Sequence, residues 1–123
     1  MSKKIIFFIL LVVILLLIVI IVKSKSSNAN QYDAFAKCIT AQGAKMWGAD
    51  WCNHCKEQKK MFGGSWQYIT YIECAIPGRS DQTKQCGDAG IRAYPTWEFK
   101  DGTKREGKLS FEELASLTTC PLL

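Results

Sequence analysis

The 123-residue chain has little of several features whose scarcity narrows its possible functions. It has one histidine and one Cys-x-x-Cys pair, whereas a structural zinc site typically takes four ligands in two close pairs. A c-type haem requires a histidine directly after the second cysteine of that pair, and position 56 is lysine. The chain also has no internal repeat and no low-complexity tract. We therefore expect neither a metal site nor a cofactor.

A basic surface is also missing, although the formal net charge is +5. Four of the 16 lysines and arginines flank one apolar segment, and they are Lys3, Lys4, Lys23 and Lys25. Without them, 12 basic residues face 11 acidic ones, a net charge of about +1. No basic patch remains that would favour nucleic acid as a partner.

That apolar segment, Ile5 to Val22, contains no glycine, proline or charged residue. A helix of this length spans roughly 27 Å, close to the roughly 30 Å of a bilayer's hydrocarbon core. It predicts a single-pass transmembrane anchor over residues 1–23. A cleaved signal peptide is the alternative, with Ser27-Asn28-Ala29 as its candidate cleavage site, but its apolar region is usually shorter.

Cysteine is abundant, with six residues in the chain. This density is typical of an oxidising compartment, and the lysines on either side of the anchor slightly favour export of the part that follows. We therefore expect a domain on the extracytoplasmic side of a membrane, whether periplasmic, luminal or extracellular. Six cysteines allow fifteen pairings, so their number alone does not give the connectivity.

After the anchor, residues 24–30 predict a flexible polar tether and residues 31–123 predict one domain. Tyr32, Phe35, Ala36 and Ile39 form a helical stripe that Gly43 can end. The remaining patterns predict a strand at Ala44–Ala49 and a helix at Cys52–Phe62, with Gln58 on the solvent-facing side of that helix. They then predict a strand at Trp66–Glu73, a loop at Ala75–Ser80 and a short helix at Asp81–Ala89. The last elements are strands at Thr96–Lys100 and Thr103–Glu106 and a helix from the Ser110 capping box through Leu117.

These elements predict an α/β fold with a mixed sheet. A strand, a crossover helix and a second strand imply parallel pairing. Asp101-Gly102 between the last two strands predicts an antiparallel hairpin with a type I′ turn. The central sheet is thus expected to be flanked by helices.

The most informative motif is Trp51-Cys-Asn-His-Cys55, which opens a helix directly after a short apolar strand. At a helix N-terminus the free N–H groups and the macrodipole favour a thiolate over a thiol. A thiolate attacks disulfides, so this spacing predicts thiol–disulfide exchange. Cys52 is expected to be the exposed attacking thiolate and Cys55 the more buried resolving thiol. A structural bridge or half of a zinc site is the alternative.

The soluble part resembles thioredoxin-like domains, and more narrowly those associated with bacterial and plant vitamin K epoxide reductase homologues. The matching segments are Phe35-Ala-Lys-Cys38, Trp51-Cys-Asn-His-Cys55 with Lys56-Glu-Gln-Lys59, Tyr71-Ile-Glu-Cys74, Gly90-Ile-Arg-Ala-Tyr-Pro-Thr-Trp97 and Phe111-Glu-Glu-Leu-Ala115. The resemblance implies a thioredoxin-like fold and a separate membrane redox partner such as a vitamin K epoxide reductase homologue. Met46 stands where thioredoxins usually bury an acid, which is a departure from the family pattern.

Four residues are expected to support the dithiol. His54 could stabilise the Cys52 thiolate, or be a solvent-facing helix residue without a role. Pro95 resembles the family's cis-proline, which implies a backbone edge free to pair with substrate and a role for Tyr94 in specificity; an ordinary trans proline is the alternative. Trp51 is expected either to pack on the motif as a lid or to be part of the core.

The other four cysteines are expected to be structural or free. Cys74 and Cys86 flank a loop of eleven residues and are the candidate for a structural disulfide, with a second redox pair as the alternative. A bond between Cys38 and Cys120 is expected to be absent, because their helices usually pack on opposite faces of such a sheet. We expect Cys38 to be free and buried, and Cys120 to be available to another protein.

The sequence thus predicts a membrane-anchored thiol–disulfide oxidoreductase. Its substrates would be proteins with thiols, which it oxidises before it passes the electrons to a membrane oxidase. Two alternatives stay open: a reductase or isomerase fed by a membrane electron carrier, which would act on proteins with disulfides, and a redox-inert binding module.

Overall fold

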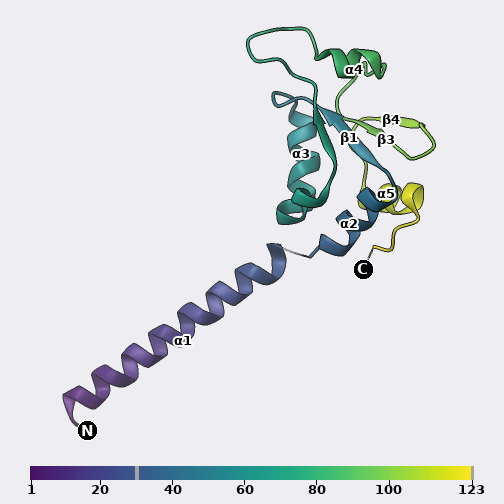
Figure 1. Cartoon of the computed structure of the whole chain (residues 1–123). Coiled ribbons are helices and arrows are strands. Elements are labelled where there is room, and N and C mark those ends of the chain that lie inside the picture. Colours follow the sequence, from purple (N-terminus) through teal and green to yellow (C-terminus); the bar gives the residue numbers. More distant parts are fainter. Residues whose placement is uncertain (30, 123) are drawn as a thin grey trace. The chain divides into compact units, whose positions relative to one another are not determined.

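A computed structural model describes residues 1–29 and 31–122, which form two compact units, Met1–Gln31 and Tyr32–Leu123 (Figure 1). The first unit consists of helix α1, Lys3–Ala29. Within it, Lys3–Lys23 has a mean hydropathy of 4.1 and is long and apolar enough to cross a membrane. A signal sequence near the N-terminus satisfies the same criterion, so α1 fits either an anchor or a signal.

Helix α1 continues beyond the apolar stretch into the segment that we expected to be a flexible tether. The helix ends at Ala29, so the expectation that residues 24–29 lack regular structure is wrong. The physical reason is that the segment contains no proline or glycine that would stop a helix already begun upstream. Asn30, the last residue of the expected tether, lies outside the described residues.

The second unit contains the predicted alternation of helices and strands. Its elements are α2 (Asp33–Ala41), β1 (Lys45–Gly48), α3 (Asn53–Phe62), the 3₁₀ helix η1 (Gly63–Tyr68), β2 (Tyr71–Glu73), α4 (Lys84–Asp88), β3 (Thr96–Glu98), β4 (Lys104–Glu106) and α5 (Phe111–Thr118). The capping box at Ser110 is confirmed, because its side chain and that of Glu113 each accept a hydrogen bond from the other residue's backbone N–H.

The four strands form one sheet in the order β2-β1-β3-β4. β1 pairs in parallel with β2 and antiparallel with β3, and β3 pairs antiparallel with β4. Helices cover this sheet, as Figure 1 shows for α2, α3 and α5. The predicted α/β fold, with a mixed sheet flanked by helices, is confirmed.

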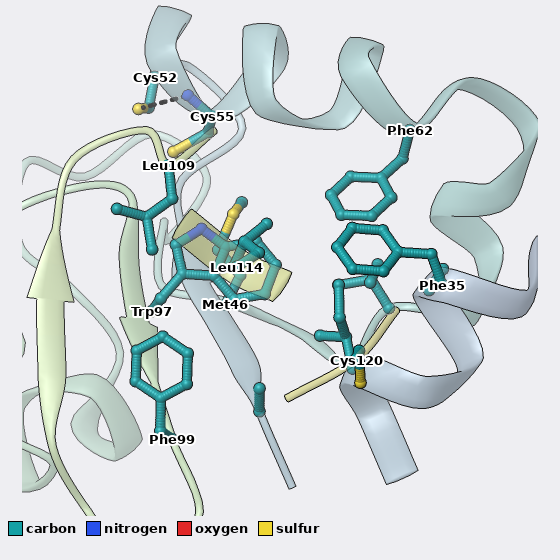
Figure 2. Close-up of a cluster of buried hydrophobic side chains, with 14 of the residues drawn as sticks. Phe35, Met46, Cys52, Cys55, Phe62, Trp97, Phe99, Leu109, Leu114 and Cys120 are labelled. Atoms are coloured by element: carbon teal, nitrogen blue, oxygen red, sulfur yellow. Dashed lines mark hydrogen bonds between the residues drawn. The ribbon is translucent and has the colours of Figure 1, made fainter. Parts of the chain in front are cut away.

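Side chains of β1 alternate between two cores because successive strand residues face opposite sides of a sheet. Met46 lies in the larger cluster, with Phe62 of α3, Trp97 of β3 and Leu114 of α5. Trp47 lies in the smaller cluster, which also contains Cys74, Cys86 and Ile91. Figure 2 shows the larger cluster, with the two cysteines of the Cys-x-x-Cys motif at one end of it.

The predicted strand at Trp66–Glu73 is only partly correct. Its first three residues, 66–68, belong to η1, and only Tyr71–Glu73 pairs with β1. Gly63 has a φ of +55°, which redirects the chain after α3 into the 3₁₀ helix. The Trp66 ring then packs on Phe62 of α3 and on Tyr71 of β2, with ring centroids 5.8 Å apart in each pair.

The turn of the β3–β4 hairpin differs from the prediction. A type I′ turn needs positive φ at both central residues, but Gly102 has a φ of +82° and Asp101 does not have a positive φ. The Gly102 N–H donates to the Phe99 carbonyl at 2.8 Å, which is the pattern of a three-residue loop with glycine in the left-handed position. Asp101 instead accepts hydrogen bonds from the Thr103 N–H and hydroxyl.

Gln58 is completely buried, so the expectation that it lies on the solvent-facing side of α3 is wrong. Its amide donates to the Leu109 carbonyl at 3.0 Å and accepts from the Leu109 N–H and the Trp97 indole. These bonds compensate the cost of burying the amide. They join α3 to β3 and to the segment before α5.

The expectation that Cys38 and Cys120 are not bonded is also wrong. The two form a disulfide with a Cα–Cα distance of 5.8 Å, and Cys120 is 3% exposed. The expectation is wrong because α2 and α5 pack on the same side of the sheet. There the ring centroids of Phe35 and Phe111 are 5.5 Å apart. Thr119, in the left-handed conformation, ends α5 and precedes the bonded cysteine.

Candidate active site

Cys52 is the N-cap residue of α3, directly after the turn that follows β1. It is only 6% exposed, so the expectation that it is exposed is wrong, because it packs in the larger core cluster. Its sulfur accepts a hydrogen bond from the Cys55 N–H at 3.2 Å, drawn as the dashed line in Figure 2. An N–H group that points at the sulfur stabilises negative charge there, as do the other free N–H groups of a helix start. The local sequence therefore places one cysteine where an attacking thiolate is favoured.

Cys55 lies one turn further and is completely buried. Burial raises the pKa of its thiol to about 12, and the hydrogen bond with Cys52 acts in the same direction. Cys55 is therefore a neutral thiol at physiological pH. Both cysteines are free thiols in this structure, so the pair is in its dithiol form.

Trp51 and Tyr94 form the aromatic surface next to the motif. The Trp51 side chain is exposed, at 63%, and its ring meets that of Tyr94 edge-on at a centroid distance of 5.8 Å. The alternative that Trp51 belongs to the core is therefore wrong. The Tyr94 hydroxyl donates to the Gln82 side chain, and the Tyr94–Pro95 peptide bond is cis, with Pro95 buried.

His54 points away from the dithiol in this structure. Its side chain is 71% exposed, and Nδ1 lies 3.5 Å from a carboxylate oxygen of Glu57. Glu57 also accepts a hydrogen bond from Lys108 at 2.8 Å, and this contact lowers the pKa of the Glu57 carboxyl. Among the described residues, the structure gives no hydrogen bond between His54 and Cys52. Its predicted role in stabilising the thiolate stays a prediction.

The structure joins Cys74 and Cys86 in a disulfide with a Cα–Cα distance of 5.7 Å. Both are completely buried in the smaller core, on the side of the sheet away from α3. The bond connects the end of β2 to α4, and Gln82, which contacts Tyr94, lies between the two cysteines in the chain. The segment that carries Gln82, the hydrogen-bond partner of Tyr94, is therefore closed by the Cys74–Cys86 disulfide.

Three further residues surround Cys55, and sequence reasoning gave them no role in the site. Gly48 of β1 lies beneath the cysteine, and Tyr71 and Glu73 lie on the neighbouring strand β2. The Tyr71 hydroxyl donates to a Glu73 carboxylate oxygen at 2.8 Å. The sequence signal that could have identified Tyr71 and Glu73 is their spacing of two residues, which puts both side chains on one face of β2.

This arrangement can perform two-step disulfide chemistry. Cys52 supplies the sulfur at the helix start, and Cys55 is held as a thiol one turn away, where its backbone N–H donates to the Cys52 sulfur. The exposed Trp51 and the half-buried Tyr94 lie beside them at the surface. The site therefore combines one sulfur suited to attack, one suited to resolution and an apolar surface for a partner chain.

Comparison with known proteins points to the same chemistry. No family model matches the chain. The chain is 42% identical over 98 residues to the thiol-disulfide oxidoreductase LTO1 of Arabidopsis thaliana, an alignment that covers 76% of this chain. It spans only 26% of the length of that relative. A solved complex of ferredoxin:thioredoxin reductase and thioredoxin f2 aligns with 68% of this chain and 84% of its matched chain, at 20% identity and a TM-score of 0.38.

Proposed function

We propose that the chain is a membrane-anchored thiol–disulfide oxidoreductase that uses Cys52 and Cys55. The observation that carries this proposal is the asymmetry of the pair: the Cys52 sulfur caps a helix and accepts an N–H, whereas Cys55 is buried and protonated. The similarity to a protein named as a thiol-disulfide oxidoreductase supports the same activity.

The proposed direction is oxidation of thiols in substrate proteins. A substrate thiolate attacks the Cys52 sulfur of the oxidised pair, which breaks the Cys52–Cys55 bond and forms a mixed disulfide. A second substrate thiolate then attacks the substrate sulfur of that mixed disulfide and releases Cys52. The substrate gains one disulfide, and the chain gains two electrons and two protons as its dithiol.

A separate membrane oxidase would remove these electrons and restore the Cys52–Cys55 disulfide. The sequence resemblance to thioredoxin-like domains that work beside vitamin K epoxide reductase homologues makes such a homologue our proposed partner. α1 would hold the domain at the membrane where this partner lies, and the two further disulfides favour an extracytoplasmic location.

Trp51 and Tyr94 would contact the substrate chain, and the buried Pro95 would hold the backbone edge next to them. The exposed Trp51 ring against Tyr94 supports this role, because an apolar surface beside the reactive sulfur can bind an extended segment. His54 would act on Cys52 only after rotation away from Glu57.

Trapping of mixed disulfides tests this function. The full chain, in detergent micelles, carries Cys55→Ser or Cys52→Ser and is incubated with a reduced, unfolded protein and an oxidant. We expect Cys55→Ser to accumulate a covalent complex through Cys52, because the resolving thiol is gone, and Cys52→Ser to form none. Equal trapping by both variants, or by neither, would contradict the proposal.

The midpoint potential of the pair decides the direction. An oxidant is expected near the roughly −120 mV of a strongly oxidising member of this class, and a reductant near the roughly −270 mV of thioredoxin. Titration of the full chain in glutathione buffers measures it. A thioredoxin-like value would replace our proposal with the reductase or isomerase alternative.

A further inference from the structure

Any exchange through this site needs a route for the Cys55 proton. Cys55 must lose its proton when it attacks a mixed disulfide on Cys52, and must regain one when it leaves as a thiolate. The side chain is completely buried, so bulk water does not reach its sulfur. Met46 and Ala49 of the preceding segment belong to the same buried cluster and offer no side-chain group that takes up a proton.

The Tyr71 hydroxyl is a group near this sulfur that can exchange a proton. A methyl group at Gly48 would lie 3.0 Å from the Cys55 sulfur and 3.1 Å from the Tyr71 hydroxyl oxygen. The sulfur and the hydroxyl oxygen are therefore at most about 6 Å apart. One bridging water can carry a proton between groups at this separation.

From Tyr71 the route continues to the surface through Glu73. The Tyr71 hydroxyl donates to Glu73 Oε2 at 2.8 Å, and Glu73 is exposed whereas Tyr71 is half-buried. The other carboxylate oxygen accepts the N–H groups of Asp50 and Ala75, at 3.1 and 2.8 Å, which fixes the carboxylate in this orientation. The three groups thus run in order from the buried sulfur to solvent.

We propose that Tyr71 and Glu73 form the proton relay of Cys55. During resolution, the Cys55 thiol gives its proton to the Tyr71 oxygen while Tyr71 passes its own proton to the Glu73 carboxylate. The Cys55 sulfur then forms a bond with Cys52, and the bond between Cys52 and the substrate sulfur breaks, releasing a substrate thiolate. In the reverse direction the same path returns a proton from solvent to the departing Cys55 thiolate. The relay rests on the proposed function.

Other charged and titratable groups around Cys55 fit this role less well. Lys59 of α3 lies over the Tyr71 ring, 3.7 Å from its centroid, where its positive charge favours a thiolate but has no free acceptor for a proton. Tyr94 donates its hydroxyl proton to Gln82, and His54 is paired with Glu57 at the surface. Burial and the hydrogen bond to Glu73 raise the pKa of Tyr71, so its hydroxyl stays neutral and passes protons without storing charge.

Two successive exchanges with dithiobis(nitrobenzoic acid) separate the steps. Attack by Cys52 releases the first nitrothiobenzoate, and attack by Cys55 on the resulting mixed disulfide releases the second. The full chain in detergent micelles is used, with Cys52 and Cys55 reduced and the other four cysteines shown by peptide mass to be oxidised. Tyr71→Phe removes the hydroxyl but keeps the ring that packs on Trp66 and Lys59.

We expect Tyr71→Phe to slow the second release by about 10²-fold near pH 7, the lower end of what a positioned proton acceptor contributes. The first release should stay within about twofold, because Cys52 does not use the relay. The deficit should shrink as pH rises, since hydroxide replaces the relay. Tyr68→Phe is the matched control, because Tyr68 is also half-buried beneath a lysine, Lys37, and should leave both releases unchanged.

Glu73→Gln gives a second test, in which the direction of the change in the second release rate is informative. Loss of a nearby negative charge would by itself ease ionisation of Cys55 and accelerate the second release, whereas loss of the proton acceptor slows it. The relay predicts slower release, with the N–H groups of Asp50 and Ala75 still bonded to the amide oxygen. Unchanged or faster second release in both Tyr71→Phe and Glu73→Gln would overturn the relay.

The outcome also distinguishes the relay from the proposed function. If the relay is wrong but the function right, the first release stays at the rate of the unmodified chain in both variants, and the second release is unchanged or faster. If the function is wrong, the unmodified chain itself gives no fast first release from Cys52. A purely structural role of Tyr71 would lower thermal stability without changing the pH profile of the second release.

Discussion

The six cysteines differ more in chemistry than in burial, since five are buried and Cys38 is half-buried. Cys55, Cys74 and Cys86 are all completely buried, yet the first is a free thiol and the other two form a disulfide. What distinguishes Cys52 and Cys55 is their place at the start of α3 beside the exposed Trp51. Reactivity in this molecule therefore follows from helix position and access, and not from exposure of the sulfur alone.

The two disulfides connect parts of the domain that the sheet alone does not. Cys38–Cys120 spans 82 residues and ties the C-terminal end to α2. Cys74–Cys86 spans 12 residues and closes the smaller core. Among the described residues, the other buried members of this core are Trp47 and Ile91. The redox pair could thus be opened and closed while the scaffold stays covalently fixed.

Replacement of Cys52 is expected to have the largest effect on activity. Cys52→Ser removes the attacking sulfur, so disulfide exchange with a protein substrate should fall to the level without the chain, because the protonated Cys55 cannot replace it. The fold should be kept, since serine can still cap α3. Exchange rate and thermal unfolding of the full chain measure both. Retained exchange in Cys52→Ser would contradict the division of the cysteines into one reactive pair and two structural pairs.

Removal of the longer disulfide should give the largest loss of stability. The double change Cys38→Ala and Cys120→Ala is expected to lower the free energy of unfolding by about 4.5 kcal/mol on the chain-entropy estimate, because the closed loop is long. Urea unfolding followed by tryptophan fluorescence measures it. Exchange at Cys52 should persist under conditions where the domain stays folded; a loss of exchange in the folded variant would show that this bridge takes part in the chemistry.

The shorter disulfide should contribute less. Cys74→Ala with Cys86→Ala is expected to cost about 2.8 kcal/mol by the same estimate. The same unfolding measurement, on the same full chain, compares the two bridges directly. If this variant proved less stable than the one without Cys38–Cys120, packing in the smaller core would outweigh loop length.

The last expected effect is a pH dependence that is confined to the reduced form and to alkaline pH. Folding raises the pKa of Cys55 from its ordinary value of 9.0 to about 12, mainly through burial. Between these values the folded state binds more protons than the unfolded state, so the free energy of unfolding falls as pH rises. The contribution is complete below about pH 9 and is lost through about pH 12.

The oxidised chain is the control for this pH effect, because it has no Cys55 thiol. The difference in stability between the reduced and oxidised forms should therefore change across this window, and effects of titrating groups other than Cys52 and Cys55 should cancel. A constant difference would mean that Cys55 is not a buried thiol in the reduced domain.

Local sequence signals predicted the motif and the order of elements because each depends on nearby residues. The helix start at Cys52, the capping box at Ser110 and the parallel crossover all follow from short patterns. The η1 segment and the hairpin turn were harder, because φ at Gly63 and Asp101 decides them and residue type alone does not.

Features that depend on distant packing could not be predicted. The Cys38–Cys120 bond requires α2 and α5 on one side of the sheet, and the burial of Gln58 requires Trp97 and Leu109 as partners from other elements. The cluster of Gly48, Tyr71 and Glu73 around Cys55 depends on the register of β1 and β2.

The central claim is that one cysteine pair is reactive and two are structural. It is tested most directly by titration of the full chain in glutathione buffers, with each cysteine followed by alkylation and peptide mass. We predict that Cys52 and Cys55 change together at one midpoint while Cys38, Cys74, Cys86 and Cys120 stay oxidised throughout. Absence of exchange at Cys52, or reduction of either further disulfide at the same midpoint, would contradict the account.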